Sequence, residues 1–200
     1  MKKEKFFANG AEASVYETEW NGKRALVKRR IEKKYRAPAL DATLRKRRTR
    51  KEAKALRSTR QNGVACPELF LEGEFELVMQ KLEGTLLSRK QGIDGSEAFE
   101  AGRILAGLHK SGIVHGDFST SNLLAGRDGK VYVIDFGLCE MTNGLEQQAD
   151  DVIVFEKSVS DCKLAQEFRR GYKAGAGQAE KVFDRTKKIL LRARYSAATQ

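Results

Sequence analysis

The order of polar residues in the second half of the chain constrains the fold more than any other feature. Residues 115–122 read His-Gly-Asp-Phe-Ser-Thr-Ser-Asn, and an Asp-Phe-Gly sequence begins at Asp135, after an apolar run. Asp117 offers a carboxylate that can orient an attacking hydroxyl group or water and accept its proton. Asn122 and Asp135 offer the oxygen ligands that Mg²⁺ prefers when it bridges phosphates. The chain must therefore fold so that Asp135 returns to the neighbourhood of the other two residues.

The flanking sequence predicts the elements that would bring these residues together. Residues 122–125 and 131–134 are short β-rich runs separated by an Asp-Gly turn, which is a strong hairpin signal. An amphipathic helix is predicted over residues 96–110, upstream of the polar pattern. The order of helix, catalytic loop, hairpin and Asp-Phe-Gly resembles the C-terminal lobe of protein kinases, which implies phosphoryl-transfer machinery.

The N-terminal segment predicts the other half of a nucleotide site. Two strands joined by an Asn-Gly turn form a hairpin, and Lys28 ends the second strand as the phosphate-contacting lysine of kinases does. The loop before this hairpin keeps a single glycine of the usual glycine-rich pattern, so the approach of the backbone to phosphates is expected to differ. The predicted nucleotide contacts in and after this loop are Gly10, Ala11, Glu12, Ala13 and Val15.

A long basic helix should follow, because residues 41–61 lack Pro and Gly and are rich in Ala, Leu, Lys and Arg. Glu52 is the only acid in this segment after Asp41. We therefore expect Glu52 to be the ion-pair partner that positions Lys28. A salt bridge on the helix surface is the alternative.

Residues 76–84 fit a last strand of the N-terminal lobe that passes into a hinge. Backbone groups from Gln80 to Leu82 are expected to meet the adenine, with Met79 at the back of the pocket. A Met that only fills the core is the alternative for this position. Gln80 and Lys81 are unusual at a hinge, where kinases commonly carry an acidic-aromatic pair.

The chain after the Asp-Phe-Gly sequence is too short for a complete protein kinase. Only 63 residues follow it, and they contain no Ala-Pro-Glu sequence. Gly116 stands where an arginine would normally contact an activation-loop phosphate, so switching by such a phosphate is not expected. Asp151 is expected to begin a buried helix and to hydrogen-bond the catalytic-loop backbone, with a simple helix N-cap as the alternative.

Positive charge is concentrated in two parts of the chain. The net charge is +11, and residues 23–60 alone carry 17 lysines and arginines against 3 acids. Residues 181–200 carry six lysines and arginines against one acid. The positive electrostatic field of such segments attracts the phosphate backbones of nucleic acids, so contact with RNA is expected. Docking to an acidic protein surface is the alternative. The predicted RNA or partner contacts are Lys187, Lys188, Arg192 and Arg194.

Other features restrict the setting of the protein. No stretch approaches the roughly 20 apolar residues of a membrane span, and no signal-type apolar segment follows the first residues. The three cysteines are widely spaced and form no zinc pattern, which favours a reducing, cytoplasmic setting without membrane contact.

A specific block in the first half points to one family. Residues 34–45 read Lys-Tyr-Arg-Ala-Pro-Ala-Leu-Asp-Ala-Thr-Leu-Arg, and residues 48–56 read Arg-Thr-Arg-Lys-Glu-Ala-Lys-Ala-Leu. With the loop at 10–13, the catalytic loop at 115–122 and the basic C-terminal end, the chain resembles the small atypical kinases of the KEOPS (EKC) complex, the PRPK-like family, almost end to end.

This resemblance implies an ATPase or atypical serine/threonine kinase that supports threonylcarbamoyladenosine modification of tRNA. ATP and Mg²⁺ are the implied cofactors. An ASKHA-fold threonylcarbamoyl-transfer subunit, the other KEOPS subunits and tRNA are the implied partners. By motif, Asp117 is catalytic, Asn122 and Asp135 hold the metal, and Lys28 and Glu52 form the pair that positions ATP.

The predicted fold is α+β, a minimal bilobal kinase-like fold with an N-lobe over residues 1–82 and a truncated C-lobe with a basic tail over residues 83–200. A RIO-like ribosome-assembly kinase is an alternative that shares the missing substrate lobe and a Ser at position 119, although the block at 35–56 argues against it. A small-molecule phosphotransferase would need a larger C-terminal lobe. A pseudokinase scaffold is disfavoured because every ligand type is retained.

Overall fold

The N-terminal lobe is an antiparallel sheet. The computed structural model describes residues 4–10 and 12–198, with side chains as far as residue 193. The sheet has five strands in the order β1-β2-β3-β5-β4. Asn21 and Gly22 both have positive φ, as a tight hairpin turn requires, which confirms the predicted turn. The strands are β1 (Lys5–Asn9), β2 (Ala13–Trp20), β3 (Lys23–Arg30), β4 (Leu69–Glu72) and β5 (Glu76–Gln80).

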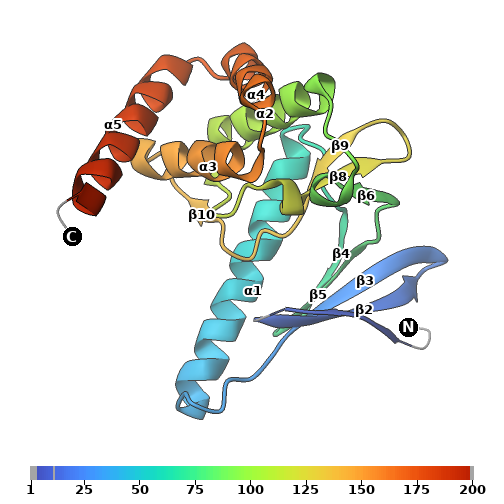
Figure 1. The fold of residues 1–200 in the computed structure, drawn as a ribbon. Helices are drawn as coiled ribbons and strands as arrows, with labels where there is room; N and C mark the ends of the chain where they lie inside the picture. Colours follow the sequence, from blue (N-terminus) through green and yellow to red (C-terminus); the bar gives the residue numbers. More distant parts are fainter. Residues whose placement is uncertain (1–3, 11, 199–200) are drawn as a thin grey trace.

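Helix α1 (Pro38–Gln61) runs beside this sheet and on into the helical lobe (Figure 1). It begins three residues before the predicted start at residue 41. The physical reason is Pro38, whose fixed φ suits the first turn and whose missing N–H needs no partner there. Ala53, Ala55 and Leu56 are buried apolar residues of this helix. The long basic helix is thus confirmed.

As far as residue 198, the C-terminal lobe consists of four helices and two small sheets beside the catalytic loop (Figure 1). The helices are α2 (Gly95–Lys110), α3 (Leu145–Ser158), α4 (Cys162–Gly175) and α5 (Ala179–Ala198). One sheet has the order β6-β8-β9, made of β6 (Gly84–Leu86), β8 (Leu123–Gly126) and β9 (Val131–Val133). The other pairs β7 (Ile113–Val114) with β10 (Glu140–Met141). Two 3₁₀ turns are η1 (Leu87–Arg89) and η2 (Thr120–Asn122). The predicted hairpin is confirmed, but Asn122 lies in η2, just before the strand.

Helices α2 and α4 cross at unusually close range. A Cβ atom on Gly171 would lie 1.9 Å from the carbonyl oxygen of Phe99, and one on Gly102 would lie 2.0 Å from the carbonyl oxygen of Phe168. Glycine at both positions lets the two backbones touch. At its start, α2 is fixed by a capping box between Asp94 and Glu97.

One hydrophobic cluster joins the two lobes. It includes Leu56 of α1 and Leu77 of β5 together with Phe118, Phe136 and Phe168 of the C-terminal lobe. Because α1 contributes to this cluster, its position is coupled to the packing under the catalytic loop. Within the described residues, no helix combines the length and the apolar character that a membrane span requires.

Candidate active site

A buried carboxylate sets the shape of the catalytic loop. Asp151 accepts hydrogen bonds from the backbone N–H of His115 at 2.7 Å and of Gly116 at 2.8 Å. The predicted hydrogen bonding by Asp151 is confirmed, but the predicted helix start there is wrong. Helix α3 already begins at Leu145, because the polar residues before Asp151 are good helix formers.

His115 lies in the neutral form beneath Asp117. Its Nε2 donates to the carbonyl of Ile134 at 3.1 Å, and its Nδ1 accepts from the N–H of Asp117 at 3.3 Å. Burial lowers the pKa of His115 below its ordinary value, in keeping with an unprotonated Nδ1. The imidazole thus links the strand end before Asp135 to the loop that carries Asp117.

Asp117 and Asn122 are in direct contact, and the N–H of Ile134, the residue before Asp135, donates to the Asn122 carbonyl at 2.9 Å. The amide nitrogen of Asn122 donates to the backbone carbonyl and to Oδ2 of Asp117, both at 2.8 Å. Both bonds use the nitrogen, so the amide oxygen is the ligand that Asn122 has to offer a cation. Asp135 has a φ of 60°, and its Oδ1 accepts from the N–H of Gly137 at 3.1 Å. The same oxygen contacts the Lys28 ammonium, so the carboxylate faces the lysine of the N-terminal lobe.

Lys28 bridges the two halves of the site. Its Nζ lies 2.6 Å from Oε1 of Glu52 and 2.6 Å from Oδ1 of Asp135. The predicted contact between Lys28 and Glu52 is therefore present, and the surface alternative is wrong because the Glu52 side chain is only 2% exposed. Burial by itself would lower the pKa of Lys28, but the two carboxylates outweigh it and raise that pKa. Loss of water around Asp135 raises the pKa of that carboxyl group, and the Lys28 ammonium more than offsets this, so the net shift is downward.

Sequence reasoning missed Arg30, the last residue of β3. Its Nη2 lies 2.6 Å from the second carboxylate oxygen of Glu52, and its side chain is buried. Arg30 stands among the many lysines and arginines of residues 23–60, and a basic stretch of this kind gives no sign of which member is buried. Period-two alternation along the strand would have shown that Arg30 and Lys28 leave the same face.

The predicted nucleotide loop contacts α1 through Glu12. The N–H of Gly10 donates to the carbonyl of Ala13 at 2.9 Å, which closes the turn. The carboxylate of Glu12 forms an ion pair with Arg48 of α1. Val15 lies opposite Lys28 in the pairing of β2 with β3. Ala11 lies outside the described residues.

Of the three predicted hinge residues 80–82, only Leu82 has a backbone N–H that is available to a ligand. The N–H of Gln80 donates to the carbonyl of Glu68 at 2.8 Å, and the N–H of Lys81 donates to the carbonyl of Arg24 at 3.1 Å. No backbone hydrogen bond among the described residues uses the N–H of Leu82. Met79 is partly buried against the main hydrophobic cluster. Both interpretations of Met79 fit this position.

The donor set fits a magnesium ion held jointly with a nucleotide. Among the described residues, no group of three His, Cys, Asp or Glu side chains could hold a metal ion alone. One carboxylate and one amide oxygen, from Asp135 and Asn122, match Mg²⁺, which keeps waters and takes its remaining ligands from phosphates. The residues thus fit the ion only if phosphate oxygens supply further ligands.

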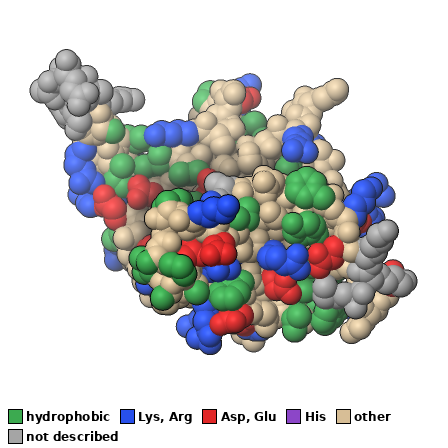
Figure 2. Space-filling view, turned by 90° about the horizontal axis from the view of Figure 1, so that it is seen from below, with side chains coloured by type: hydrophobic (Ala, Val, Ile, Leu, Met, Phe, Trp, Pro, Cys, Tyr) green, Lys and Arg blue, Asp and Glu red, His purple; other side chains and the backbone are tan. Residues whose placement is uncertain are grey.

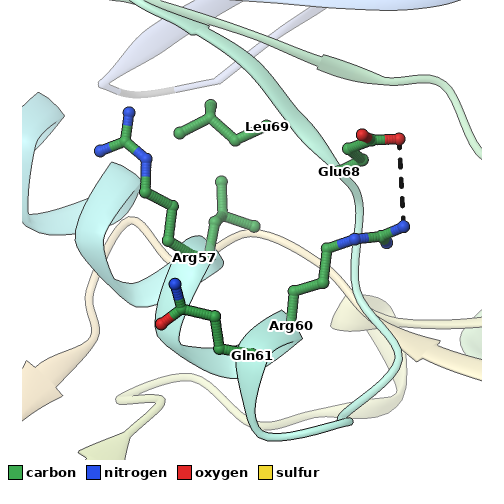
Figure 3. Close-up of a pocket in the computed structure, with 6 residues that line it drawn as sticks. Arg57, Arg60, Gln61, Glu68 and Leu69 are labelled. Carbon is green, nitrogen blue, oxygen red and sulfur yellow. Dashed lines mark ion pairs between the residues drawn. The ribbon is translucent and has the colours of Figure 1, made fainter.

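A hollow between the C-terminal half of α1 and β4 lies apart from these residues (Figure 3). Leu56 and Leu69 line it, flanked by Arg57 and Arg60. The Arg60 guanidinium lies 3.9 Å from the Glu68 carboxylate, and Arg57 pairs with an acid of β4. The two guanidinium groups point apart in Figure 3, so they are not arranged to bind one anionic ligand together.

The predicted RNA contacts lie on helix α5, away from the N-terminal sheet (Figure 1). Arg192 pairs with Glu146 at 2.8 Å, and Lys187 lies 3.2 Å from Asp184. Lys188 is exposed. The side chain of Arg194 lies outside the described part of the chain.

A two-lobed fold with a lysine–glutamate pair, an Asp-Asn catalytic loop and an Asp-Phe-Gly aspartate defines the protein-kinase-like class. The RIO domain model matches residues 14–169. The KEOPS complex subunit Bud32 of Pyrococcus abyssi is 34% identical, with 96% of each chain covered, and the EKC/KEOPS subunit BUD32 of Encephalitozoon cuniculi is 39% identical, with 84% of this chain and 87% of that one covered. The chain therefore belongs to the Bud32 family of RIO-domain atypical kinases.

Two further likenesses concern a longer relative and the fold. A probable bifunctional tRNA threonylcarbamoyladenosine biosynthesis protein of Methanosarcina mazei is 40% identical over 94% of this chain. The chain spans only 35% of that relative's length. The structure of the Rio2 kinase–ADP/Mg²⁺–phosphoaspartate complex from Chaetomium thermophilum superposes with a TM-score of 0.65 at 14% identity, covering 98% of this chain and 71% of that one. This second likeness shows the fold alone.

Proposed function

We propose that the chain is the ATP-dependent phosphoryl-transfer subunit, an ATPase or atypical serine/threonine kinase, of a KEOPS-type assembly that supports threonylcarbamoyladenosine modification of tRNA. The observation that carries the proposal is Lys28, whose ammonium contacts both Glu52 and Asp135 at 2.6 Å. This contact unites the two lobes of a nucleotide site. The names of the Bud32 relatives and of the bifunctional relatives support the choice of assembly.

The residues divide the chemistry among them. Lys28 exchanges the Asp135 carboxylate for the nucleotide phosphates, while Glu52 holds its position. Asp117, held by the Asn122 amide, orients an attacking hydroxyl group or water and accepts its proton. Asn122 and Asp135 would hold Mg²⁺, which neutralises phosphate charge when bound. We assign the nucleotide contacts to the loop and hinge residues Gly10, Ala11, Glu12, Ala13, Val15, Met79, Gln80 and Leu82.

The partners follow from the same assignment. We place an ASKHA-fold threonylcarbamoyl-transfer subunit, the other KEOPS subunits and tRNA among them. The relatives named Bud32 are KEOPS subunits, and the bifunctional relatives are longer than this chain. The setting is the cytoplasm, in keeping with the free thiols of Cys66, Cys139 and Cys162.

For RNA, we assign the contacts to Lys187, Lys188, Arg192 and Arg194. Figure 2 shows acidic side chains interspersed among basic ones on the face seen from below, and Arg192 has an acidic partner in Glu146. Exposed ion pairs of this kind are weak, so a phosphate can replace the carboxylate. RNA binding at this surface would thus require RNA phosphates to displace carboxylates from existing ion pairs.

The experiment that tests the proposal measures Mg²⁺-dependent ATP hydrolysis by the chain alone and with the threonylcarbamoyl-transfer subunit and tRNA added. We expect measurable turnover by the chain and stimulation by the added components. A chain that binds no nucleotide in the presence of Mg²⁺ would contradict the proposal. If the rate of ATP hydrolysis does not change with either addition, the result supports the phosphoryl-transfer chemistry and contradicts the role in the KEOPS-type assembly.

A further inference from the structure

The guanidinium group of Arg30 is buried, and it has no role in the phosphoryl-transfer steps proposed for Lys28, Asp117, Asn122 and Asp135. Its side chain is 4% exposed, and its Nη2 lies 2.6 Å from Oε2 of Glu52. The other oxygen of the same carboxylate receives the Lys28 ammonium at 2.6 Å. Each oxygen of Glu52 thus has a cation of its own, and both cations come from one strand.

The alternation of β3 explains this arrangement. Lys28 and Arg30 are two positions apart, so their side chains leave the same face of the strand. Arg29, between them, leaves the other face and pairs with Glu4 and Glu76. The backbone of Arg30 is also fixed, because its N–H donates to the carbonyl of Phe75 at 2.9 Å. The sheet therefore presents two fixed cations to α1.

We propose that Arg30 is a positioning residue that holds Glu52, and with it α1, in the orientation that keeps Lys28 ready for the nucleotide phosphates. This inference rests on the proposed function. Lys28 must leave Asp135 when phosphates arrive, and a Glu52 bound by Lys28 alone could rotate with it. The Arg30 guanidinium removes that freedom, because charge pairs are strong where water is excluded.

The same contact accounts for an active site without a phosphorylated activation loop. In protein kinases, phosphorylation of that loop controls the position of the helix that carries the glutamate. Here Gly116 has a φ of 79°, and a Cβ atom at this position would lie 2.6 Å from the carbonyl oxygen of Leu138, so no arginine fits there to read a phosphate. The Arg30–Glu52 contact is internal and needs no modification. It fixes α1 in the unmodified chain.

The test compares Arg30→Met with Arg29→Met, which removes the same charge from the neighbouring position on the other face. The measurements are kcat and KM for ATP hydrolysis and the Kd values of ADP and adenosine. We expect Arg30→Met to lower kcat/KM by about 10-fold or more and to weaken ADP binding. Adenosine binding should be unchanged, because adenosine has no phosphate for Lys28 to hold. Arg29→Met should leave all these values near those of the parent.

Conservative rescue and a double-mutant cycle separate positioning from a structural role. One nitrogen of Arg30 makes the contact, so Arg30→Lys should recover most of the loss. In a Glu52→Gln background, Arg30→Met should cost less than about threefold, because the two residues act as a unit. If Arg30→Met fails to fold, as judged by thermal unfolding, Arg30→Gln takes its place in the same comparison.

A folded variant at Arg30 with the parent kcat/KM overturns the inference. Equal weakening of ADP and adenosine binding also overturns it, because that result indicates a general structural loss. Additive effects of the Arg30 and Glu52 substitutions overturn it as well. Failure of the proposed function looks different, since the parent chain itself would then bind no ADP.

Discussion

At the residue scale, the catalytic loop depends on a network of buried polar side chains. Asp151 accepts from two loop N–H groups, and Nε2 of His109 lies 3.2 Å from the same carboxylate. The hydroxyl group of Tyr172 lies 2.8 Å from Nδ1 of His109. Burial raises the pKa of Tyr172, which therefore stays neutral. Helices α2, α3 and α4 thereby all contribute to the position of Asp117.

His115 makes the stability of the protein depend on pH. Its pKa is lowered from 6.5 in the folded state, so the unfolded chain takes up a proton first as the pH falls. The stabilisation is thus complete above the unfolded pKa and is lost as the pH falls from there towards the folded pKa. Between about pH 7 and pH 5.5 we therefore expect the free energy of unfolding to fall, with His115 contributing to the fall.

Urea unfolding at both pH values measures this drop for the parent and for His115→Gln. The variant should lose most of the difference between the two pH values, because glutamine does not titrate. An equal pH dependence in both proteins would show that other groups dominate.

Most residues of the site could be identified from the sequence, but Arg30 could not. Glu52 was identifiable because it is the only acid after Asp41 in its helix, and Asp117, Asn122 and Asp135 were identifiable by their spacing. Arg30 was not, because a run of basic residues gives no sign of which member is buried. That choice depends on which face of β3 meets α1, and hence on tertiary packing.

At the element scale, the crossing of α2 and α4 gives a sharp prediction for stability. In Gly171→Ala the new methyl group would lie 1.9 Å from the carbonyl oxygen of Phe99, so the helices must separate. We expect a loss of about 1–3 kcal/mol, measured by chemical unfolding, as for other overpacked cores.

Gly177→Ala is the matched control for Gly171→Ala. A Cβ atom at Gly177 would have no heavy atom within 4 Å, so the stability of the Gly177→Ala variant should stay close to that of the parent. Equal effects of the two substitutions would contradict the close crossing.

The helices and hairpins could be predicted from the sequence, but the first residues of α1 and α3 were predicted wrongly. Hairpins at residues 21–22 and 128–129 follow from Asn-Gly and Asp-Gly turns, which the structure confirms. Pro38 could have marked the start of α1, since proline favours a first turn. Asp151 resembled a cap because an apolar run follows it, yet it serves as a buried anchor in mid-helix.

At the scale of the whole molecule, the proposed contact with tRNA rests on the net charge of +11. Deletion of residues 192–200 should weaken tRNA binding and flatten its salt dependence, with the log–log slope falling by about 0.7–0.9 for each lost phosphate contact. Basal ATP hydrolysis should persist, because the catalytic loop lies on other elements. Filter binding across a salt series measures both quantities.

Arg47, Arg50 and Lys54 provide the comparison for this deletion. They are exposed along one face of α1 and form no ion pair with a described residue. Their replacement by glutamine should change tRNA binding less than the deletion does. A well-folded deletion with unchanged affinity and slope, beside a large loss on α1, would move the RNA contact from α5 to α1.

We propose that Asp117 and Asp135 perform phosphoryl-transfer chemistry. The most direct measurement is Mg²⁺-dependent ATP turnover by Asp117→Ala and Asp135→Ala, with Asp128→Ala in the neighbouring hairpin as the control. We expect a fall of about 100-fold or more for the first two and less than about threefold for the control, with all three proteins folded. Parent-like turnover by both Asp117→Ala and Asp135→Ala would contradict it.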